Sequence, residues 1–358
     1  MFPRRISRVI SVGDVKIGGG YPLSIQSMTN TKTADVTATL QQIAVLQSAG
    51  CQIVRTAVPD LEAAQALPLI LRESKIPVVA DIHFDYRLAL AAIKARVQGL
   101  RINPGNIGAR YKIKEVVLSA KDAGIPIRIG VNAGSLEKDL LAAYGLSAQA
   151  MVESALRHVE ILEAENFSDL KISLKASDIP LMIEAYRLLA KQVDYPFHIG
   201  VTEAGTYKRG SIRSACGLSI LLAEGLGDTL RVSLTGDPVM EITVAQEILA
   251  ALHLRKNKFE FISCPTCGRT MIDVERIALE VEKHLEMLTP PRPLKIAVMG
   301  CVVNGPGEAK GADLGIAGGE NEGVLFYQGQ AIGRYANDQL AQALIDKVRE
   351  IINQEEDR

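Results

Sequence analysis

The chain has 358 residues, which at roughly 150 residues per domain allows two domains or one large domain with an addition. Its hydrophobic fraction of 47% and charged fraction of 23% are those of a folded protein and exclude long disorder or a fibrous repeat. The 40 Lys and Arg residues balance 41 Asp and Glu residues, so no global basic field draws the chain to nucleic acid or to an anionic membrane. Any anion site must therefore be a local concentration of positive charge.

The chain shows no sign of a membrane or export segment. No apolar run reaches the roughly 18 residues that cross a bilayer, and no hydrophobic stretch of signal-peptide type follows the first residues. We expect a cytoplasmic protein. Three of its 5 cysteines, Cys264, Cys267 and Cys301, fall late in the chain. The odd number and this distribution argue against a disulfide framework and favour metal or redox chemistry.

The first 256 residues alternate between short β-rich runs and helix-length segments. Eight candidate strands recur at intervals of roughly 22 to 43 residues, which is the rhythm of βα units. They start near Leu23, Cys51, Pro77, Gly99, Pro126, Asp169, Phe197 and Thr229. Asp35, Asp178 and the pair Asp237 and Pro238 are typical helix starts. The pattern predicts a (β/α)8 TIM barrel. An open doubly wound sheet would alternate in the same way, but no G-x-G-x-x-G follows its first strand.

From residue 257 the pattern changes, and we expect a small α/β domain over 257–358 after a barrel over 1–256. The periodicity predicts an amphipathic helix over about 271–288 and a final helix after Tyr335. It also predicts a strand from Leu294 and another around 324–327. A Pro-rich break and a Gly-rich stretch over 300–319 separate these elements.

Charged residues occupy the candidate barrel strands where a buried parallel strand is normally apolar. With a period of two they share one face of each strand, which we expect to point into the barrel. The cations are Arg55, Arg101, Arg128, Lys175 and Arg231. Pairing with Asp81 or Glu203 would explain a single cation, but five on five strands predict a ligand with several negative charges. Because Arg and Lys suit phosphate oxygens, we expect a phosphorylated or diphosphorylated small molecule.

The three late cysteines form a second candidate site. Cys264 and Cys267 share a C-x-x-C turn, and Cys301 opens a Gly-rich segment that also holds Glu308. A redox disulfide and a zinc ribbon are the alternatives, but a ribbon usually has a fourth nitrogen or sulfur ligand, often in a second C-x-x-C. The pattern favours a metal site and leaves zinc and iron–sulfur open. Three thiolates would leave one iron of a [4Fe-4S] cluster for an exchangeable ligand.

Five segments together resemble the family of 4-hydroxy-3-methylbut-2-enyl diphosphate synthases, the iron–sulfur enzymes of the methylerythritol phosphate route to isoprenoids. They are residues 24–33 (SIQSMTNTKT), 78–84 (VVADIHF), 100–108 (LRINPGNIG), 264–270 (CPTCGRT) and 300–308 (GCVVNGPGE). The resemblance covers nearly the whole chain. It is to the short bacterial form, since the extra domain of plant members is absent.

The resemblance implies the reductive ring opening and dehydroxylation of 2-C-methyl-D-erythritol 2,4-cyclodiphosphate. Two electrons would pass singly through a [4Fe-4S] cluster from reduced ferredoxin or flavodoxin. The implied cluster ligands are Cys264, Cys267, Cys301 and Glu308, with Asn304 beside the cluster. The implied diphosphate-binding residues are Arg55, Arg101, Arg128 and Lys175, supported by His83, Asn132, Thr202, Arg231 and Ser233. Glu203 is the expected proton donor, and Glu308 could leave its iron to a substrate oxygen.

Two other functions compete with this interpretation. One is a non-redox barrel enzyme that acts on a phosphorylated ligand and carries a structural zinc domain. The other is a non-catalytic iron–sulfur sensor of an anionic metabolite. Visible absorption distinguishes zinc from iron–sulfur, and turnover with a reductant distinguishes an enzyme from a sensor.

Barrel geometry also predicts a homodimer whose sites are shared between chains. Barrel helices return from the catalytic carboxyl ends of the strands, so the last helix, over about 237–253, ends at the opposite face. The second domain thus leaves its own barrel far from the mouth. A head-to-tail dimer, which the family resemblance also implies, lets each second domain cover its partner's barrel. The alternative is a second domain that folds back onto its own barrel.

Overall fold

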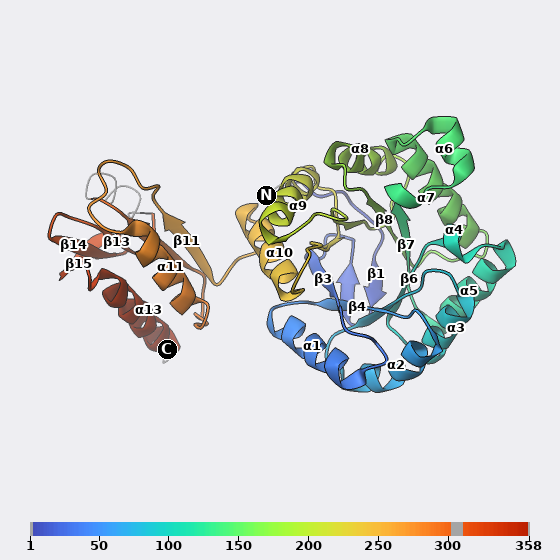
Figure 1. Cartoon of the computed structure of the whole chain (residues 1–358), viewed down its shortest axis with the longest axis horizontal. Coiled ribbons are helices and arrows are strands. Elements are labelled where there is room, and N and C mark those ends of the chain that lie inside the picture. Colours follow the sequence, from blue (N-terminus) through green and yellow to red (C-terminus); the bar gives the residue numbers. More distant parts are fainter. Residues whose placement is uncertain (1–2, 302–310, 357–358) are drawn as a thin grey trace. The chain divides into compact units, whose positions relative to one another are not determined.

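The structure is a computed structural model that describes residues 3–301 and 311–356. The chain divides into two compact units, Met1–Arg255 and Lys256–Arg358. Figure 1 labels most of the elements of each unit. Within the described residues, no helix is long and apolar enough to span a membrane.

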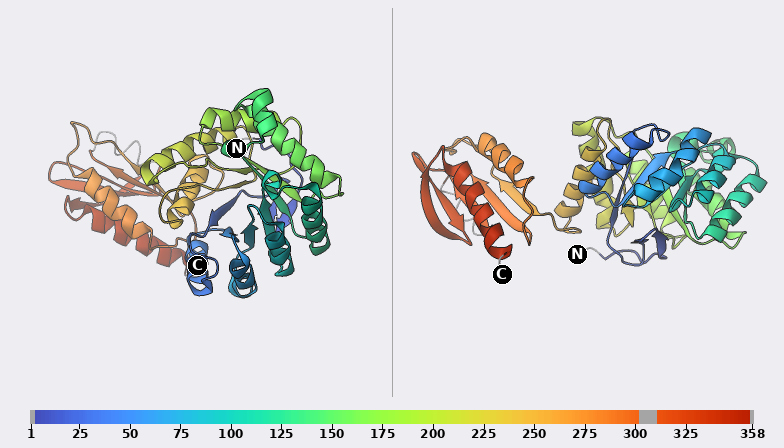
Figure 2. Two further views of the ribbon diagram at one scale, coloured as in Figure 1. Left: turned by 45° about the vertical axis from the view of Figure 1, so that its right-hand side comes forward. Right: turned by 90° about the horizontal axis from the view of Figure 1, so that it is seen from below.

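The first unit is a nearly closed barrel of eight parallel strands inside a ring of helices (Figure 1), and Figure 2 shows the same arrangement from two further directions. The strands are β3 (Ser24–Met28), β4 (Ile53–Ala57), β5 (Val78–Asp81), β6 (Gly99–Ile102), β7 (Ile127–Asn132), β8 (Leu170–Lys175), β9 (His198–Ile199) and β10 (Thr229–Leu230). β10 pairs with β3, and a parallel bridge joins Ile172 of β8 to Phe197. The predicted barrel is confirmed, because an open sheet would leave these strands unpaired.

Ten α-helices and one short 3-10 helix belong to the described part of this unit. They are α1 (Val36–Ser48), α2 (Leu61–Glu73), α3 (Tyr86–Lys94), α4 (Pro104–Ile107), α5 (Arg110–Ala123), α6 (Lys138–Tyr144), α7 (Ala148–Glu163), α8 (Ile179–Leu189), α9 (Tyr207–Ala223), α10 (Val239–Ala251) and η1 (Ala133–Ser135). The predicted helix starts are confirmed, because Asp35, Asp178 and Asp237 each accept a backbone N–H of the following turn.

A hairpin that the sequence pattern did not predict precedes the barrel. Its strands are β1 (Ile10–Val12) and β2 (Val15–Ile17), which pair antiparallel. Its buried side chains, Ile10, Val12 and Ile17, pack against Ile53 and Val79 on the lower inner face of β4 and β5. The hairpin therefore covers the amino-terminal end of the barrel, and a ligand would enter from the carboxyl-terminal end.

In its described residues, the second unit is a mixed five-stranded sheet with two helices on one face. Its elements are β11 (Phe259–Ser263), α11 (Val274–Leu285), β12 (Leu294–Met299), β13 (Leu314–Ala317), β14 (Glu322–Tyr327), β15 (Gln330–Ala336) and α13 (Leu340–Glu356). β11, β12 and β13 are parallel, and β14 and β15 continue the sheet antiparallel. Both predicted helices and both predicted strands are present. β13 lies inside the stretch whose glycines predicted a loop.

Candidate active site

The inner face of the barrel carries the cations that the sequence places on its strands. Ile127 and Ile129 of β7 pack outward into the core beneath the helices, so Arg128 between them points inward. The same alternation applies to the other strands. The buried cations of the barrel strands are Arg55, Arg101, Arg128, Lys171 and Lys175. Arg231, which directly follows β10, is partly buried.

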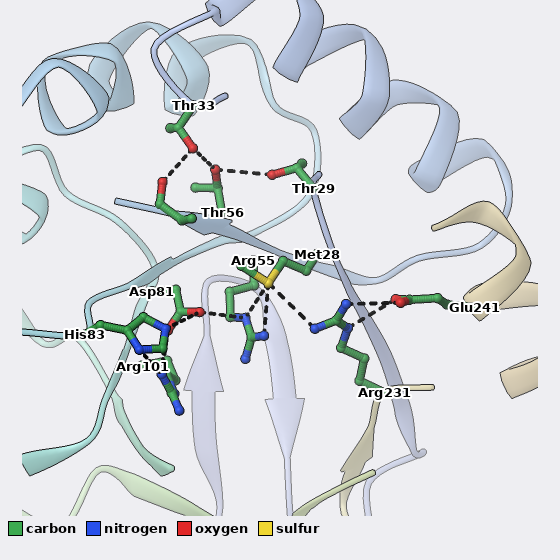
Figure 3. Close-up of polar contacts among 11 residues, drawn as sticks. Met28, Thr29, Thr33, Arg55, Thr56, Asp81, His83, Arg101, Arg231 and Glu241 are labelled. Carbon is green, nitrogen blue, oxygen red and sulfur yellow. Dashed lines mark hydrogen bonds and ion pairs between the residues drawn. The ribbon is translucent and has the colours of Figure 1, made fainter. Parts of the chain in front are cut away.

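Asp81, the last residue of β5, is the counterion of two of these cations (Figure 3). Its Oδ1 accepts a hydrogen bond of 3.1 Å from Nη1 of Arg101, and its Oδ2 lies 3.4 Å from Nε of Arg55. His83 completes the cluster, with Nε2 3.6 Å from Asp81 Oδ2 and 3.1 Å from Arg101 Nη1. Burial raises the pKa of Asp81, but the charge of Arg55 and the contacts with His83 and Arg101 outweigh burial and hold this pKa well below its usual range. Asp81 is therefore ionised at neutral pH.

Glu241, in the first turn of α10, holds Arg231 through two hydrogen bonds, 3.1 Å from Nε and 3.0 Å from Nη2. Nη1 of Arg231 lies 3.6 Å from Sδ of Met28, and Nη2 of Arg55 approaches the same sulfur at 3.0 Å (Figure 3). A thioether is a weak acceptor. Two guanidinium groups thus converge on a neutral atom and keep donors for an anion.

Arg128 and Lys175 lie on the adjacent strands β7 and β8. Nε and Nη1 of Arg128 are buried without an acceptor among the described residues. Burial lowers the pKa of both side chains well below their ordinary values, and the neighbouring arginines lower it further. Burial likewise lowers the pKa of Arg55 to about 10. An anionic ligand would offset this electrostatic cost, because opposite charge favours the charged form of each cation.

Two inward-facing glycines give these cations the space that they occupy. A Cβ at Gly130 of β7 would lie 2.7 Å from Nε of Arg101, and a Cβ at Gly200 would lie 2.8 Å from Nζ of Lys175. The same Cβ at Gly200 would also lie 2.4 Å from the carbonyl oxygen of Arg231. Side chains at these positions would displace the cations, so the barrel interior is shaped for them.

The remaining predicted substrate contacts lie at or after the carboxyl ends of strands. Asn132 ends β7 and is partly buried. Thr202 and Ser233 follow β9 and β10 and are also partly buried. The side chain of His83 is 51% exposed, so it is open to a ligand. Glu203 is exposed and has a φ of 52°, an uncommon backbone conformation for a non-glycine residue.

Five residues of the site were missed by the sequence analysis. They are Met28, Gly130, Lys171, Gly200 and Glu241. Alternation would have identified Lys171, which lies four residues before Lys175 on the same strand. It would also have identified Gly130, two residues after Arg128. No local pattern identifies Glu241, because its partner Arg231 is brought to it only by the fold.

In the second unit, two of the three late cysteines follow neighbouring parallel strands. Cys264 follows β11 and Cys301 lies two residues after β12. Sγ of Cys264 accepts a hydrogen bond of 3.0 Å from the backbone N–H of Gly300, the residue before Cys301. The backbone N–H of Met271, four residues after Cys267, donates to the carbonyl oxygen of the same Gly300. The fold therefore brings the C-x-x-C turn beside the backbone at Cys301.

The three thiols differ in their surroundings. Cys301 is buried, Cys264 is partly buried and Cys267 is exposed, and all three are free of disulfides. Hydrogen bonding from the backbone N–H of Arg269 lowers the pKa of Cys267, which favours the thiolate that binds metals. Within residues 3–301 and 311–356, no three His, Cys, Asp or Glu side chains are grouped closely enough to hold a metal ion. Asn304 and Glu308, the other two residues predicted for this site, lie outside the described residues.

Comparison with solved structures agrees with the barrel fold. A sialic acid synthetase from Leptospira borgpetersenii superposes with a TM-score of 0.51 at 14% sequence identity, covering 70% of this chain and 92% of its own. A dihydropteroate synthase from Stenotrophomonas maltophilia gives 0.50 at 12% identity, covering 69% of this chain and 98% of its own. At such low identity these similarities concern the fold alone.

Comparison with protein families and curated sequences is more specific. The family description "GcpE TIM-barrel domain" matches residues 7–246, and "GcpE protein C-terminal domain" matches residues 260–350. A protein of Geobacter sulfurreducens named 4-hydroxy-3-methylbut-2-en-1-yl diphosphate synthase (flavodoxin) is 58% identical, over 97% of this chain and 98% of its own length. A protein of the same name from Clostridium acetobutylicum is 56% identical, over 96% and 98%. The chain therefore belongs to the GcpE family.

Proposed function

We propose that the chain catalyses the reductive ring opening and dehydroxylation of 2-C-methyl-D-erythritol 2,4-cyclodiphosphate to 4-hydroxy-3-methylbut-2-enyl diphosphate in isoprenoid biosynthesis. The observation that carries the proposal is the charge of the barrel interior. Six basic side chains, those of Arg231 and of the five buried Arg and Lys residues of the strands, face the two carboxylates Asp81 and Glu241. A ligand with two negatively charged phosphate groups would offset much of this excess positive charge. The names of the relatives support the same reaction.

We assign substrate binding to the barrel over residues 1–256. Arg55, Arg101, Arg128 and Lys175 would hold the diphosphate through charge-assisted hydrogen bonds, as guanidinium forks and an ammonium do best. His83, Asn132, Thr202, Arg231 and Ser233 would orient the rest of the substrate. The partly exposed ring of His83 beside the Asp81 pair supports its place at the entrance.

Glu203 is our candidate for the group that protonates the departing hydroxyl. Loss of hydroxide is unfavourable, so a carboxylic acid within hydrogen-bond reach would help it to leave as water. Its exposure beside the barrel strands supports this role, because a ligand at the mouth could reach it.

We assign a [4Fe-4S] cluster to the domain over residues 257–358, with Cys264, Cys267, Cys301 and Glu308 as ligands and Asn304 nearby. When bound, such a cluster supplies electrons one at a time at low potential. The hydrogen bond from Gly300 to the sulfur of Cys264 fits this group, since backbone N–H donors to ligand sulfur tune cluster potentials. The lowered pKa of Cys267 fits a thiolate ligand as well.

Reduced flavodoxin is the electron donor that we propose. The support is the word flavodoxin in the names of relatives that are 58% and 56% identical to this chain. A ferredoxin would serve the same chemistry, and reduction with each purified carrier distinguishes the two. We also place the reaction in the cytoplasm.

We further propose that the enzyme is a homodimer with each active site shared between two chains. α10 has 13 residues and so spans about 20 Å, running from the carboxyl-end side of the barrel back toward its amino end. The chain therefore leaves the barrel at the end away from its mouth. Two-fold symmetry would allow each second domain to serve its partner's barrel.

The test is anaerobic purification with iron, sulfide and zinc analysis, followed by an assay on the cyclodiphosphate with dithionite as reductant. We expect iron and sulfide near four of each per chain, brown absorption and conversion to the linear diphosphate. Zinc without iron would favour a non-redox enzyme. An intact cluster without turnover, whether dithionite or reduced flavodoxin supplies the electrons, would favour a sensor. Either result would overturn the proposal.

A further inference from the structure

Lys171 is a second lysine on the inner face of β8, four residues before Lys175. Its side chain is buried, and the residue is 2% exposed. Nζ has no hydrogen-bond acceptor among the described residues. Its partner in the strand register is Arg128, another cation that is buried with unsatisfied donors. An ammonium in this position would have no carboxylate of the described residues to offset the cost of its burial.

The other strands offer Lys171 little compensation. The buried or partly buried ionisable groups on the inner face or at its rim are Arg55 on β4, Asp81 on β5, Arg101 on β6, Arg128 on β7, Lys175 on β8, His198 on β9, and Arg231 with Glu241 after β10. His83 and Glu203 are exposed at the mouth. β3 contributes Gln26 and Met28, which carry no charge. Of the two carboxylates, Asp81 contacts Arg55 and Arg101, and Glu241 contacts Arg231. Both are thus engaged by arginines.

His198 of β9 also gives Lys171 no negative charge. It is fully buried, and neither ring nitrogen has a hydrogen-bond partner among the described residues. Burial and then the charges of Arg128 and Lys175 lower its pKa well below the ordinary value, so the ring is neutral. A neutral His198 beside an uncharged Lys171 avoids electrostatic repulsion between the two buried side chains in the ligand-free barrel. Burial, followed by the charges of Arg128 and Arg55, lowers the pKa of Lys171 to about 7.

We propose that Lys171, which is buried opposite Arg128 with no acceptor for its ammonium among the described residues, is uncharged in the ligand-free barrel and takes up a proton when the cyclic diphosphate binds at the mouth. This inference rests on the proposed function for the identity of the ligand. Two phosphate charges beside Arg128 and Lys175 would replace a repulsive field with an attractive one, which favours the ammonium form of Lys171. Lys171 is a positioning residue. Once protonated, the ammonium of Lys171 would repel the guanidinium of Arg128. This repulsion would favour the position of Arg128 in which its guanidinium contacts the phosphate.

The ligand itself helps the test. Each phosphorus of a cyclic diphosphate carries only one ionisable oxygen, which is strongly acidic, so the free ligand does not titrate near neutral pH. Protons taken up on binding therefore come to the protein. Lys175 also has a pKa lowered by burial and by Arg128, so it contributes to the number of protons taken up on binding. The contribution of Lys171 is the difference between the wild type and a variant that lacks its amine.

The experiment is calorimetric titration of the full-length protein with 2-C-methyl-D-erythritol 2,4-cyclodiphosphate in buffers of different ionisation enthalpy, at pH 6 and pH 8. In the wild type we expect proton uptake at pH 8 and less at pH 6. Lys171→Met should lower the uptake at pH 8 by about one proton. It should also flatten the fall of affinity with rising pH, which a single linked proton makes about tenfold per pH unit. The matched control is Lys138→Met, at an exposed lysine of α6, which should behave as the wild type.

The outcomes separate the inference from the proposed function. If the wild type does not bind the cyclodiphosphate at all, the proposed function fails. If it binds without proton uptake at pH 8, or if Lys171→Met takes up as many protons as the wild type, the inference is wrong. Lys171→Gln provides a second neutral variant should the Met variant not fold, and the wild-type comparison of pH 6 with pH 8 needs no variant.

Discussion

Gly130 lies directly beside the guanidinium of Arg101, so closely that a Cβ at residue 130 would stand 2.7 Å from Nε of Arg101. The nearest atoms belong to the end of a long side chain, which can move. The cost of a methyl group here would therefore fall on the position of Arg101 more than on the backbone of β7. Arg101 would then lose its alignment with Asp81 and with a bound phosphate.

We expect Gly130→Ala to weaken cyclodiphosphate binding by about 1.5–3 kcal/mol, the usual contribution of a hydrogen bond to a charged group, with the fold retained. Direct titration of the purified variant measures this. Gly134→Ala is the control, because a Cβ at Gly134, just past the same strand, would meet no atom within 4 Å. Equal affinities of the two variants would show that Arg101 does not need this space.

Lys175→Ala should weaken substrate binding by about 1.5–3 kcal/mol, because a buried ammonium makes charge-assisted hydrogen bonds to phosphate. The brown absorption of the protein should remain, since this residue belongs to the barrel unit. Titration and visible spectra of the anaerobically purified variant give both readings. Lys191→Ala, at an exposed lysine, is the control. Loss of absorption with unchanged affinity would contradict the assignment.

Asp81→Asn should lower the free energy of unfolding by about 3–5 kcal/mol, because it leaves Arg55 and Arg101 buried without their carboxylate. The folded-state pKa of Asp81 is depressed, so its contribution to stability is present above the unfolded pKa of about 3.9. It is lost as the pH falls through the folded-state pKa. Urea unfolding of both proteins across this range should show the difference narrowing only in acid.

Asp85→Asn is the matched control for this charge removal. Asp85 caps α3 by accepting the backbone N–H of Arg87, and Asn caps helices equally well. Its ion pair with Arg87 is largely exposed. We expect a change within about 1 kcal/mol. A similar loss in both variants would mean that burial of the Asp81 pair has no special energetic role.

Cys264→Ser, Cys267→Ser and Cys301→Ser should each lose iron and activity, because iron prefers thiolate ligands. Glu308→Ala should keep more iron than these variants and lose activity. Iron and sulfide analysis of anaerobic protein, with the dithionite-driven assay, measures both. Cys216→Ser, at an exposed thiol of α9, should behave as the wild type. Full activity in any of the other three serine variants would refute the ligand set.

The sequence predicts the eight barrel strands well because each is a short β-rich run between helix-length segments, and local periodicity suffices for such elements. The amino-terminal hairpin was not predicted because its two short antiparallel strands precede the βα repeat and do not follow its spacing. The role of Gly130 was not predicted from the sequence, for another reason. Its constraint comes from Arg101 on the neighbouring strand, and only the register of β6 against β7 reveals it. The same holds for Glu241, whose partner Arg231 becomes visible only when α10 is placed over the barrel.

The last prediction concerns sharing of the active site between chains. Lys175→Ala removes a barrel residue and Cys301→Ser removes a proposed cluster ligand, so each should be inactive as a homodimer. In a mixed dimer of the two variants, a shared site would combine the intact barrel of one chain with the intact cluster domain of the other. One of the two sites should then work, giving about half of the wild-type activity per dimer.

Differently tagged chains, coexpressed and purified through both tags, provide the mixed dimer for this measurement. If each chain instead used its own cluster domain, every site in the mixed dimer would carry one of the two defects. The mixed dimer would then be as inactive as the two homodimers. A dimer of Lys175→Ala with a wild-type chain, purified in the same way, is the control. It keeps one intact site under either arrangement, so its activity shows that tagging and coexpression do not themselves inactivate the enzyme.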